Sequence, residues 1–309
     1  MRLRLERFAR AAVTLGVCAA AAGAAARAQE RIRGGIDLVS LHVTVMDGNR
    51  YITDLEEPDF EVYEDGVKQQ VSFFSRLQQP IAMAVLLDTS ASMEGHLGTA
   101  QEAATGFVRQ MRPGDLMEIV DFDGQVRVLQ TFTGDVEALE RAIRTTRPSG
   151  STALYNAIYI ALRSLQKARV SVAEDIRREA IIVLSDGDDT SSLVASDEVV
   201  DLAKRSETAI YAIGLRPNDG QRRDFKRAEF FLRELSQATG GRVFYPTSSS
   251  ELPRIYAQIA QELASQYAIG YTSSNMLRNG AWRRLSVRVS RPGAVPRTRQ
   301  GYFAPGGTR

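Results

Sequence analysis

The chain has 309 residues, with 39 Lys and Arg against 37 Asp and Glu, two His and one Cys. This charge balance lacks the basic surplus that nucleic-acid and membrane-surface proteins carry. Two His and one Cys are also too few for a zinc centre built from several such ligands. The length suits one large domain, or one medium domain with a small companion.

Residues 1–28 are predicted to be an export signal that is not part of the fold. A basic region containing Arg2, Arg4, Arg7 and Arg10 precedes an apolar stretch over residues 11–26, and Ala26-Arg27-Ala28 fits a cleavage site. The apolar stretch is shorter than the about 20 residues of a membrane span, and no membrane span is expected in the mature chain. We therefore expect a secreted or periplasmic protein that begins at Gln29.

The only cysteine, Cys18, lies inside this predicted signal. A lipoprotein anchor is one interpretation, but Val17 stands where a small residue is expected, and the cleavage pattern favours an ordinary apolar signal residue. Cleavage after Ala28 leaves no cysteine for a disulfide or a thiolate metal site. It also leaves 34 basic and 36 acidic residues, so no nucleic-acid partner is expected.

Residues 29–79 are predicted to form an antiparallel β segment. Residues 37–45 alternate between polar and apolar, as in a half-buried strand, and Asp47-Gly48 allows a turn. Residues 60–64 and 67–74 flank Asp65-Gly66, which predicts a β-hairpin. The segment is too small to form a stable core alone.

From residue 80 the pattern changes to strands that alternate with helices. We predict strands over 81–87, 116–122, 126–132, 179–184, 209–214 and 242–245, and helices over 97–111, 135–146, 152–169, 196–206, 225–238 and 251–266. The run 81–87 is apolar throughout, as in a parallel strand covered on both faces. The short Asp123-Gly124 connection predicts one antiparallel edge strand. Residues 80–266 are therefore expected to be an α/β domain with a doubly wound, mostly parallel sheet and helices on both faces.

Residues 267–309 return to β-type patterns, with strands predicted over 267–271, 285–289 and 299–303. Each terminal set of strands is undersized by itself. We therefore expect the two sets to pair as a small antiparallel β subdomain.

Three loops at the carboxyl ends of predicted elements carry oxygen-rich side chains. They are Asp88-Thr89-Ser90-Ala91-Ser92, Ser149-Gly150-Ser151-Thr152 and Ser185-Asp186-Gly187. Ligands gather at the carboxyl ends of strands in an open α/β sheet, and hydroxyl and carboxylate oxygens are ligands that Mg²⁺ accepts. The loops therefore indicate one divalent-cation site if their strands are neighbours.

Each of these residues also has an ordinary structural interpretation. Asp88, Ser90 and Thr152 are of the types that cap helices, and Asp186-Gly187 is a common turn pair. The acidic pair at 188–189 fits solvated loop charge better than a second cation site.

The two histidines are expected to be solvated. His42 falls on the polar face of its strand, and His96 lies at the start of a helix. His96 is close enough to the first loop to make ligand binding depend on pH if it titrates there.

Together the three loops resemble the von Willebrand factor type A domain over residues 80–266. The similarity lies in Asp-x-Ser-x-Ser at 88–92, Ser-Gly-Ser-Thr-Ala-Leu at 149–154 and Ser-Asp-Gly-Asp-Asp at 185–189. It implies the metal-ion-dependent adhesion site of that family, made of Asp88, Ser90, Ser92, Thr152 and Asp186. Through residues 60–66 and 301–303, the flanks are similar to a group of exported acidobacterial proteins with such a domain.

The resemblance implies that Ser90 and Ser92 bind the metal directly, that Thr152 binds it directly or through water, and that Asp88 and Asp186 lie close by. The implied ion is Mg²⁺, with Mn²⁺ or Ca²⁺ as alternatives. Mostly neutral ligands leave the ion electrophilic, so the implied partner is a protein that supplies an Asp or Glu carboxylate.

An exported, metal-dependent binding module is therefore expected, and not an enzyme. One alternative is a scaffold domain of a cell-envelope assembly in which the metal only stabilises the fold. Another is a hydrolase with Ser90 or Ser92 as nucleophile and His96 as base, although no third orienting group and no Gly-x-Ser-x-Gly elbow is found. Cytosolic family members that assist metal chelatases are a further alternative, which the export signal disfavours.

Overall fold

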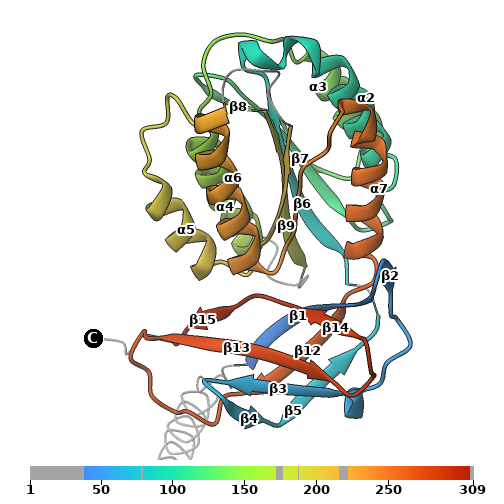
Figure 1. Ribbon diagram of the computed structural model, residues 1–309, viewed down its shortest axis with the longest axis vertical. Coiled ribbons are helices and arrows are strands. Elements are labelled where there is room, and N and C mark those ends of the chain that lie inside the picture. Colours follow the sequence, from blue (N-terminus) through green and yellow to red (C-terminus); the bar gives the residue numbers. More distant parts are fainter. Residues whose placement is uncertain (1–37, 78, 172–176, 187, 216–221, 307–309) are drawn as a thin grey trace, which may run out of the picture. The chain divides into compact units, whose positions relative to one another are not determined.

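The computed structural model describes residues 38–77, 79–171, 177–186, 188–215 and 222–306 (Figure 1). The predicted signal over 1–28, the first part of the N-terminal β segment, Gly187 of the third loop and residues 216–221 lie outside the described residues. Val39–Arg309 form one compact unit.

The α/β part is built on a six-stranded sheet with the strand order β11-β10-β9-β6-β7-β8. All neighbouring strands are parallel except β8, which runs antiparallel to β7 at one edge. The strands are β6 (Ile81–Asp88), β7 (Leu116–Phe122), β8 (Val126–Thr133), β9 (Arg178–Ser185), β10 (Ala209–Gly214) and β11 (Val243–Phe244). The predicted fold class, with its antiparallel edge strand, is confirmed.

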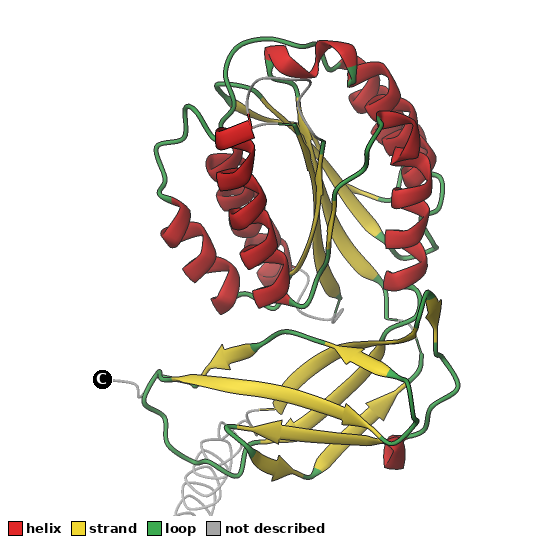
Figure 2. Cartoon of the chain, viewed as in Figure 1, coloured by secondary structure: helices red, strands yellow, loops and turns green. Residues whose placement is uncertain are grey.

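Helices cover both faces of this sheet (Figure 2). One face carries α2 (Leu97–Val108), α3 (Val136–Thr145) and α7 (Leu252–Leu263), and the other carries α4 (Leu154–Ser171), α5 (Ser196–Arg205) and α6 (Arg222–Thr239). Within the described residues, every helix is too short or too polar to cross a lipid bilayer.

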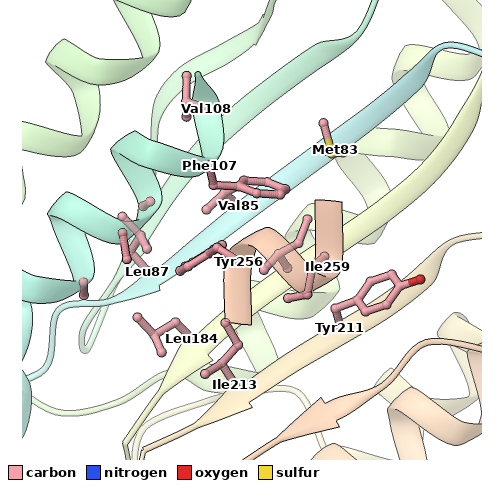
Figure 3. Close-up of a cluster of buried hydrophobic side chains, with 14 of the residues drawn as sticks. Met83, Val85, Leu87, Phe107, Val108, Leu184, Tyr211, Ile213, Tyr256 and Ile259 are labelled. Carbon is pink, nitrogen blue, oxygen red and sulfur yellow. The ribbon is translucent and has the colours of Figure 1, made fainter. Parts of the chain in front are cut away.

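The side chains of β6 explain why this strand is apolar throughout. Met83, Val85 and Leu87 join the core under α2 and α7, whereas Ala84 and Leu86 join the core on the opposite face. In the first core, the ring of Phe107 from α2 lies 5.3 Å from that of Tyr256 from α7 (Figure 3). Both faces of β6 are thus removed from water, as in other doubly covered parallel strands.

The terminal segments of the unit together form two antiparallel sheets. One has the order β14-β1-β12-β5, with β2 paired to β1, and the other has the order β15-β13-β3-β4. The strands are β1 (Leu38–Asp47), β2 (Arg50–Tyr51), β3 (Phe60–Glu64), β4 (Val67–Gln69), β5 (Val71–Ser75), β12 (Tyr267–Thr272), β13 (Trp282–Val289), β14 (Val295–Arg297) and β15 (Gly301–Phe303). Short 3-10 helices are η1 (Glu57–Asp59), η2 (Ala91–Gly95) and η3 (Ser249–Glu251). Each sheet pairs strands from both ends of the sequence, and apolar side chains from both sheets share one core.

Two details of these sheets differ from the prediction. The expected second hairpin strand over 67–74 breaks after Gln69, so that β4 pairs with β3 while β5 joins β12 in the other sheet. Strand β14 is not predicted by the sequence because Pro296 argues against a strand. Proline is tolerated there because β14 is an edge strand that pairs with β1 alone.

His42 is partly buried, so its expected full exposure to solvent is wrong. Its Nδ1 atom is inaccessible and has no hydrogen-bond partner among the described residues. Burial, followed by the charges of Arg178 and Arg299, lowers the pKa of His42 to about 3. The imidazole is therefore neutral at physiological pH.

Candidate metal centre

The candidate site lies at the carboxyl ends of two neighbouring strands, β6 and β9. These strands pair in parallel with Leu87 opposite Leu184, which places their last residues, Asp88 and Ser185, side by side. The Ser185 hydroxyl donates a 2.5 Å hydrogen bond to Oδ2 of Asp88. The sheet therefore brings the first and third sequence motifs together.

Four of the five predicted site residues form one hydrogen-bonded cluster. The backbone N–H of Ser90 donates to Oδ1 of Asp88 over 2.8 Å, and the Ser92 hydroxyl donates to Oδ1 of Asp186 over 2.8 Å. The hydroxyl oxygens of Ser90 and Ser92 lie 3.1 Å apart. Two carboxylates and two hydroxyls thus meet in one place.

Backbone contacts hold the loop of Thr152 against the first loop. The N–H of Ser149 donates to the carbonyl of Thr89 over 2.7 Å, and the N–H of Ala91 donates to the carbonyl of Gly150 over 3.1 Å. Thr152 itself is buried. Among the described residues, no hydrogen bond joins its hydroxyl to the other four, so its place beside them depends on these backbone contacts.

Helix capping does not account for these hydroxyls. Ser90 occupies the N-cap position of η2, but its side chain makes no capping hydrogen bond. The sequence predicted that the next helix starts at Thr152, but α4 begins at Leu154. The backbone N–H of Thr152 donates to the Thr190 hydroxyl, and the N–H of Ala153 donates to the carbonyl of Asp123. The side chains of Ser90 and Thr152 therefore do not serve as helix caps, the role that their residue types suggest.

The two carboxylates of the cluster are buried without a cationic partner. Asp88 is 0% exposed and Asp186 is 5% exposed, and among the described residues neither lies within 4.0 Å of a Lys, Arg or His nitrogen. Burial raises the pKa of Asp88 to about 6, against the lowering effect of its hydrogen bonds from Ser185 and Ser90. Burial also raises the pKa of Asp186. Buried carboxylates normally pair with a cation or coordinate a metal.

The donor set of this cluster fits a hard divalent cation. Hydroxyl and carboxylate oxygens are the only side-chain donors, and such ions prefer oxygen ligands. The described residues hold no group of three or more His, Cys, Asp or Glu side chains that could bind a metal. A cation at this edge would therefore have to use hydroxyl oxygens beside the carboxylates of Asp88 and Asp186.

A second acidic network braces the Thr152 loop from its other side. The Ser149 hydroxyl donates to Oδ2 of Asp123 over 2.7 Å. The guanidinium of Arg127 from β8 bridges the carboxylates of Asp121 and Asp123 with hydrogen bonds of 2.9–3.2 Å. The sequence shows Asp123-Gly124 only as a turn, because this role depends on tertiary contacts with residue 149.

The acidic pair after Gly187 is structural, so the expectation of solvated loop charge is wrong. The side chain of Asp188 is 8% exposed and lies 3.7 Å from the guanidinium of Arg227. Oδ1 of Asp189 accepts hydrogen bonds from the N–H of Tyr155 and the hydroxyl of Ser192. These carboxylates fasten the loop after β9 to α4 and α6.

This fastened loop contacts Thr152, because the N–H groups of Thr190 and Ser191 donate to the Thr152 carbonyl, and it presents an apolar side chain to solvent. The side-chain oxygen of Asn156 accepts hydrogen bonds from the N–H groups of Leu193 and Val194, each over 3.1 Å. Leu193 is 95% exposed, although its backbone is held in place.

His96 is partly buried, in contrast to its predicted exposure. Its Nδ1 atom is inaccessible and has no hydrogen-bond partner among the described residues. The hydroxyls of Ser90 and Ser92 contact each other and Asp186. The described residues thus contain no Ser–His hydrogen bond at this site, the contact by which a hydrolase activates its nucleophile.

The fold and the cluster define an open α/β domain with an oxygen-rich site at the carboxyl edge of its sheet. Residues 83–188 match the family model of the von Willebrand factor type A domain. The chain therefore contains a von Willebrand factor type A domain, and this part of the predicted resemblance is confirmed.

Curated relatives include bacterial proteins named UPF0353. The protein from Mycobacterium avium is 27% identical over 219 residues, and that from Mycobacterium leprae is 25% identical over 226 residues. These matches cover 64% and 66% of this chain, and the chain spans 65% of the length of each relative.

A similar solved structure is the von Willebrand factor type A protein from Catenulispora acidiphila. It is 12% identical, with a TM-score of 0.52, and the match covers 89% of this chain and 76% of that one. At this identity the similarity shows a shared fold.

Proposed function

We propose that this protein is a binding module that holds a partner protein through a divalent cation at the Asp88–Asp186 cluster. The observation that carries the proposal is the pair of buried carboxylates, which have no cationic partner among the described residues and which contact the hydroxyls of Ser90, Ser92 and Ser185. A divalent cation would offset the cost of burying these two charges. Mg²⁺ is the proposed ion, and Mn²⁺ or Ca²⁺ would suit the same oxygen donors.

The residues of the cluster would have different roles in binding the ion. Ser90 and Ser92 would bind it through their hydroxyls, and Thr152 directly or through water. Asp88 and Asp186 would supply negative charge and orient those hydroxyls or bound water, as groups around metal ligands generally do. The bound ion would supply an electrophilic position for an oxygen from outside the protein.

The partner chemistry follows from the neutral hydroxyl ligands. A divalent ion held mainly by hydroxyls keeps a strong attraction for an anionic oxygen, which a partner would supply from an Asp or Glu carboxylate. The exposed Leu193 would add an apolar contact beside that oxygen. Together with the predicted export signal, these features suit recognition of another protein in the cell envelope or outside the cell.

Capture of a partner in the presence and absence of metal tests this function. Immobilised protein would be incubated with envelope extract of the producing cell in Mg²⁺, in EDTA, and after Mg²⁺ is restored. We expect capture in Mg²⁺, loss in EDTA and recovery on restoration, with no capture by the Asp186→Asn variant.

A matched control for that variant is Asp201→Asn, since Asp201 is an exposed carboxylate on α5. It should capture the partner as the wild type does. Capture that persists in EDTA would move the interface away from the cluster. A rise in thermal stability with Mg²⁺, without any change in capture, would instead indicate a purely structural ion.

A further inference from the structure

A groove of about 270 Å³ opens at the other end of β6 from the candidate metal centre. Its walls come from the first residues of β6, the C-terminal turns of α2 and the last turns of α7. This volume approaches the range of about 300–1,000 Å³ that is usual for small-ligand pockets. The proposed partner contact does not use it, because β6 begins at the groove and ends at Asp88.

The lining of the groove is mixed, with apolar side chains beside polar and charged ones. Met83, Phe107 and Met111 belong to this lining, and Met83 and Phe107, which are 4% and 3% exposed, are visible in Figure 3 on β6 and α2. The wall also includes Ala260 of α7 and its C-cap residue Ala264, whose short side chains take little space.

The polar end of the groove carries a surplus of positive charge. Its charged lining residues are Arg112, Arg178 and Asp115. The two carboxylate oxygens of Asp115 already accept hydrogen bonds from the N–H groups of Ile81 and Arg112, each over 3.0 Å. Two guanidinium groups therefore face one carboxylate that is engaged with the backbone.

Arg178 is buried and contacts only uncharged oxygens. Nε and Nη2 donate to the carbonyl of Gln79, and Nη1 donates to the carbonyl of Leu263 and to the side-chain oxygen of Gln266. Among the described residues, no carboxylate lies within 4.0 Å of the Arg178 or the Arg112 guanidinium. An anion entering the groove would thus meet positive charge that the protein does not neutralise.

We propose that this groove binds a small amphipathic anion, with an aromatic ring or short acyl chain against Met83, Phe107 and Met111 and its carboxylate or sulfonate toward Arg112 and Arg178. The apolar body would gain by leaving water. The anionic group would gain from a partly buried positive charge, where the electrostatic interaction is stronger than in bulk water. A neutral molecule of the same size lacks the second contribution.

The proposal is tested by titrating the full chain with 8-anilino-1-naphthalenesulfonate, an aromatic sulfonate whose fluorescence rises in an apolar environment. We expect saturable binding of one probe per native chain. Decanoate should displace the probe at a several-fold lower concentration than decanol, which has the same chain length without the charge.

Two variants should block the groove without touching the metal centre. Ala260→Trp would fill it and should weaken probe binding at least tenfold. Gln110→Trp, at an exposed rim position, provides a second test if the first variant does not fold. Ala138→Trp, on α3 and outside the groove, is the matched control and should bind the probe as the wild type does.

The role of the charge is tested by Arg112→Gln. This variant should bind decanoate roughly fivefold more weakly, as expected for the loss of a solvent-accessible ion pair, and should bind decanol with unchanged affinity. Arg109→Gln, one turn away and paired with Glu140, is its control. Unaltered probe binding in both tryptophan variants would place the ligand elsewhere and overturn the proposal. Equal displacement by decanoate and decanol would overturn the assignment of an anion.

Discussion

The hydroxyl of Ser185 and the carboxylate of Asp88 are joined by a 2.5 Å hydrogen bond between the ends of two adjacent parallel strands. Asp88 also accepts a hydrogen bond from the backbone of Ser90. One bond thus fixes the carboxylate to β9 and the other fixes it to the loop that carries the site hydroxyls. Asp88 is held so that its oxygens cannot turn away from the cluster.

Removing the Ser185 hydroxyl should therefore weaken metal binding without removing any proposed direct ligand. Loss of a hydrogen bond that orients a group at a metal site typically costs 10–100-fold in affinity. We expect Ser185→Ala to lose Mg²⁺ affinity within this range, measured by isothermal titration calorimetry. Ser164→Ala is a matched control, because Ser164 donates a 2.8 Å bond to Glu118 elsewhere in the domain. Equal affinities of the two variants would contradict an orienting role for Ser185.

Neutralising Asp186 should separate metal binding from folding. Without metal, Asp186→Asn removes one of two buried carboxylates, so its melting temperature in EDTA should equal or exceed that of the wild type. Mg²⁺ at about 100 times its Kd should stabilise the wild type by about 2.7 kcal/mol. The variant should show no such stabilisation. A variant that melts well below the wild type in EDTA would mean that the carboxylate is needed for the fold itself.

The exposed Leu193 should contribute to partner binding and not to metal binding. An apolar side chain on a fastened loop loses little conformational freedom when it is covered by a partner. We expect Leu193→Ala to lower the affinity for the captured partner about tenfold, an effect in the range found when an energetically important interface residue is truncated. The affinity for Mg²⁺ should be unchanged. Leu277→Ala, a similarly exposed leucine between β12 and β13, should leave partner binding unaltered. If the two variants behave alike, the loop after β9 is not part of the interface.

Glu64 in the β sandwich should make stability depend on acidity. Burial opposes ionisation of Glu64, but hydrogen bonds from Ser273, Tyr271 and Tyr302 and the charge of Arg283 bring its pKa below the usual 4.5. A lowered native pKa stabilises the folded state above about pH 4.5, and this contribution is lost as the pH falls through the native pKa.

The comparison that isolates this effect is the unfolding free energy of the wild type and Glu64→Gln between pH 7 and pH 3. The wild type should be more stable by several kcal/mol at pH 7, since removing one member of a buried ion pair commonly costs about 3–5 kcal/mol. The difference should shrink as the solution becomes more acidic than pH 4.5. A difference that is constant over this range would show that Glu64 acts through packing alone.

The sequence predicts the features of this protein that depend on local patterns. The apolar run of β6 identifies a doubly covered strand, and the polar residues that follow it identify the ligand edge of the sheet. The pairing of β6 with β9 then brings Ser92 to Asp186, although 94 positions separate them. Spacing within each loop is a local property, which is why four of the five predicted site residues are found together.

Features set by contacts between distant segments are not predicted. Ser185 has no local pattern that indicates its bond to Asp88, because the bond depends on the register of β6 with β9. Alternation along β1 predicts a solvated His42, but the imidazole is partly buried, and burial and the charges of Arg178 and Arg299 lower its pKa. Strand β14 is not predicted because it contains Pro296, and proline is compatible with a strand only when the strand lies at an edge.

The most direct test of the proposed metal centre is the anomalous scattering of Mn²⁺ in crystals of the mature protein. The account predicts one anomalous peak at the carboxyl ends of β6 and β9, with the hydroxyl oxygens of Ser90 and Ser92 within coordination distance, about 2.0–2.6 Å for hard cations. It also predicts no peak in crystals of Asp186→Asn grown at the same Mn²⁺ concentration. Wild-type crystals without a peak at this cluster, at a Mn²⁺ concentration that saturates the protein in solution, would contradict the account.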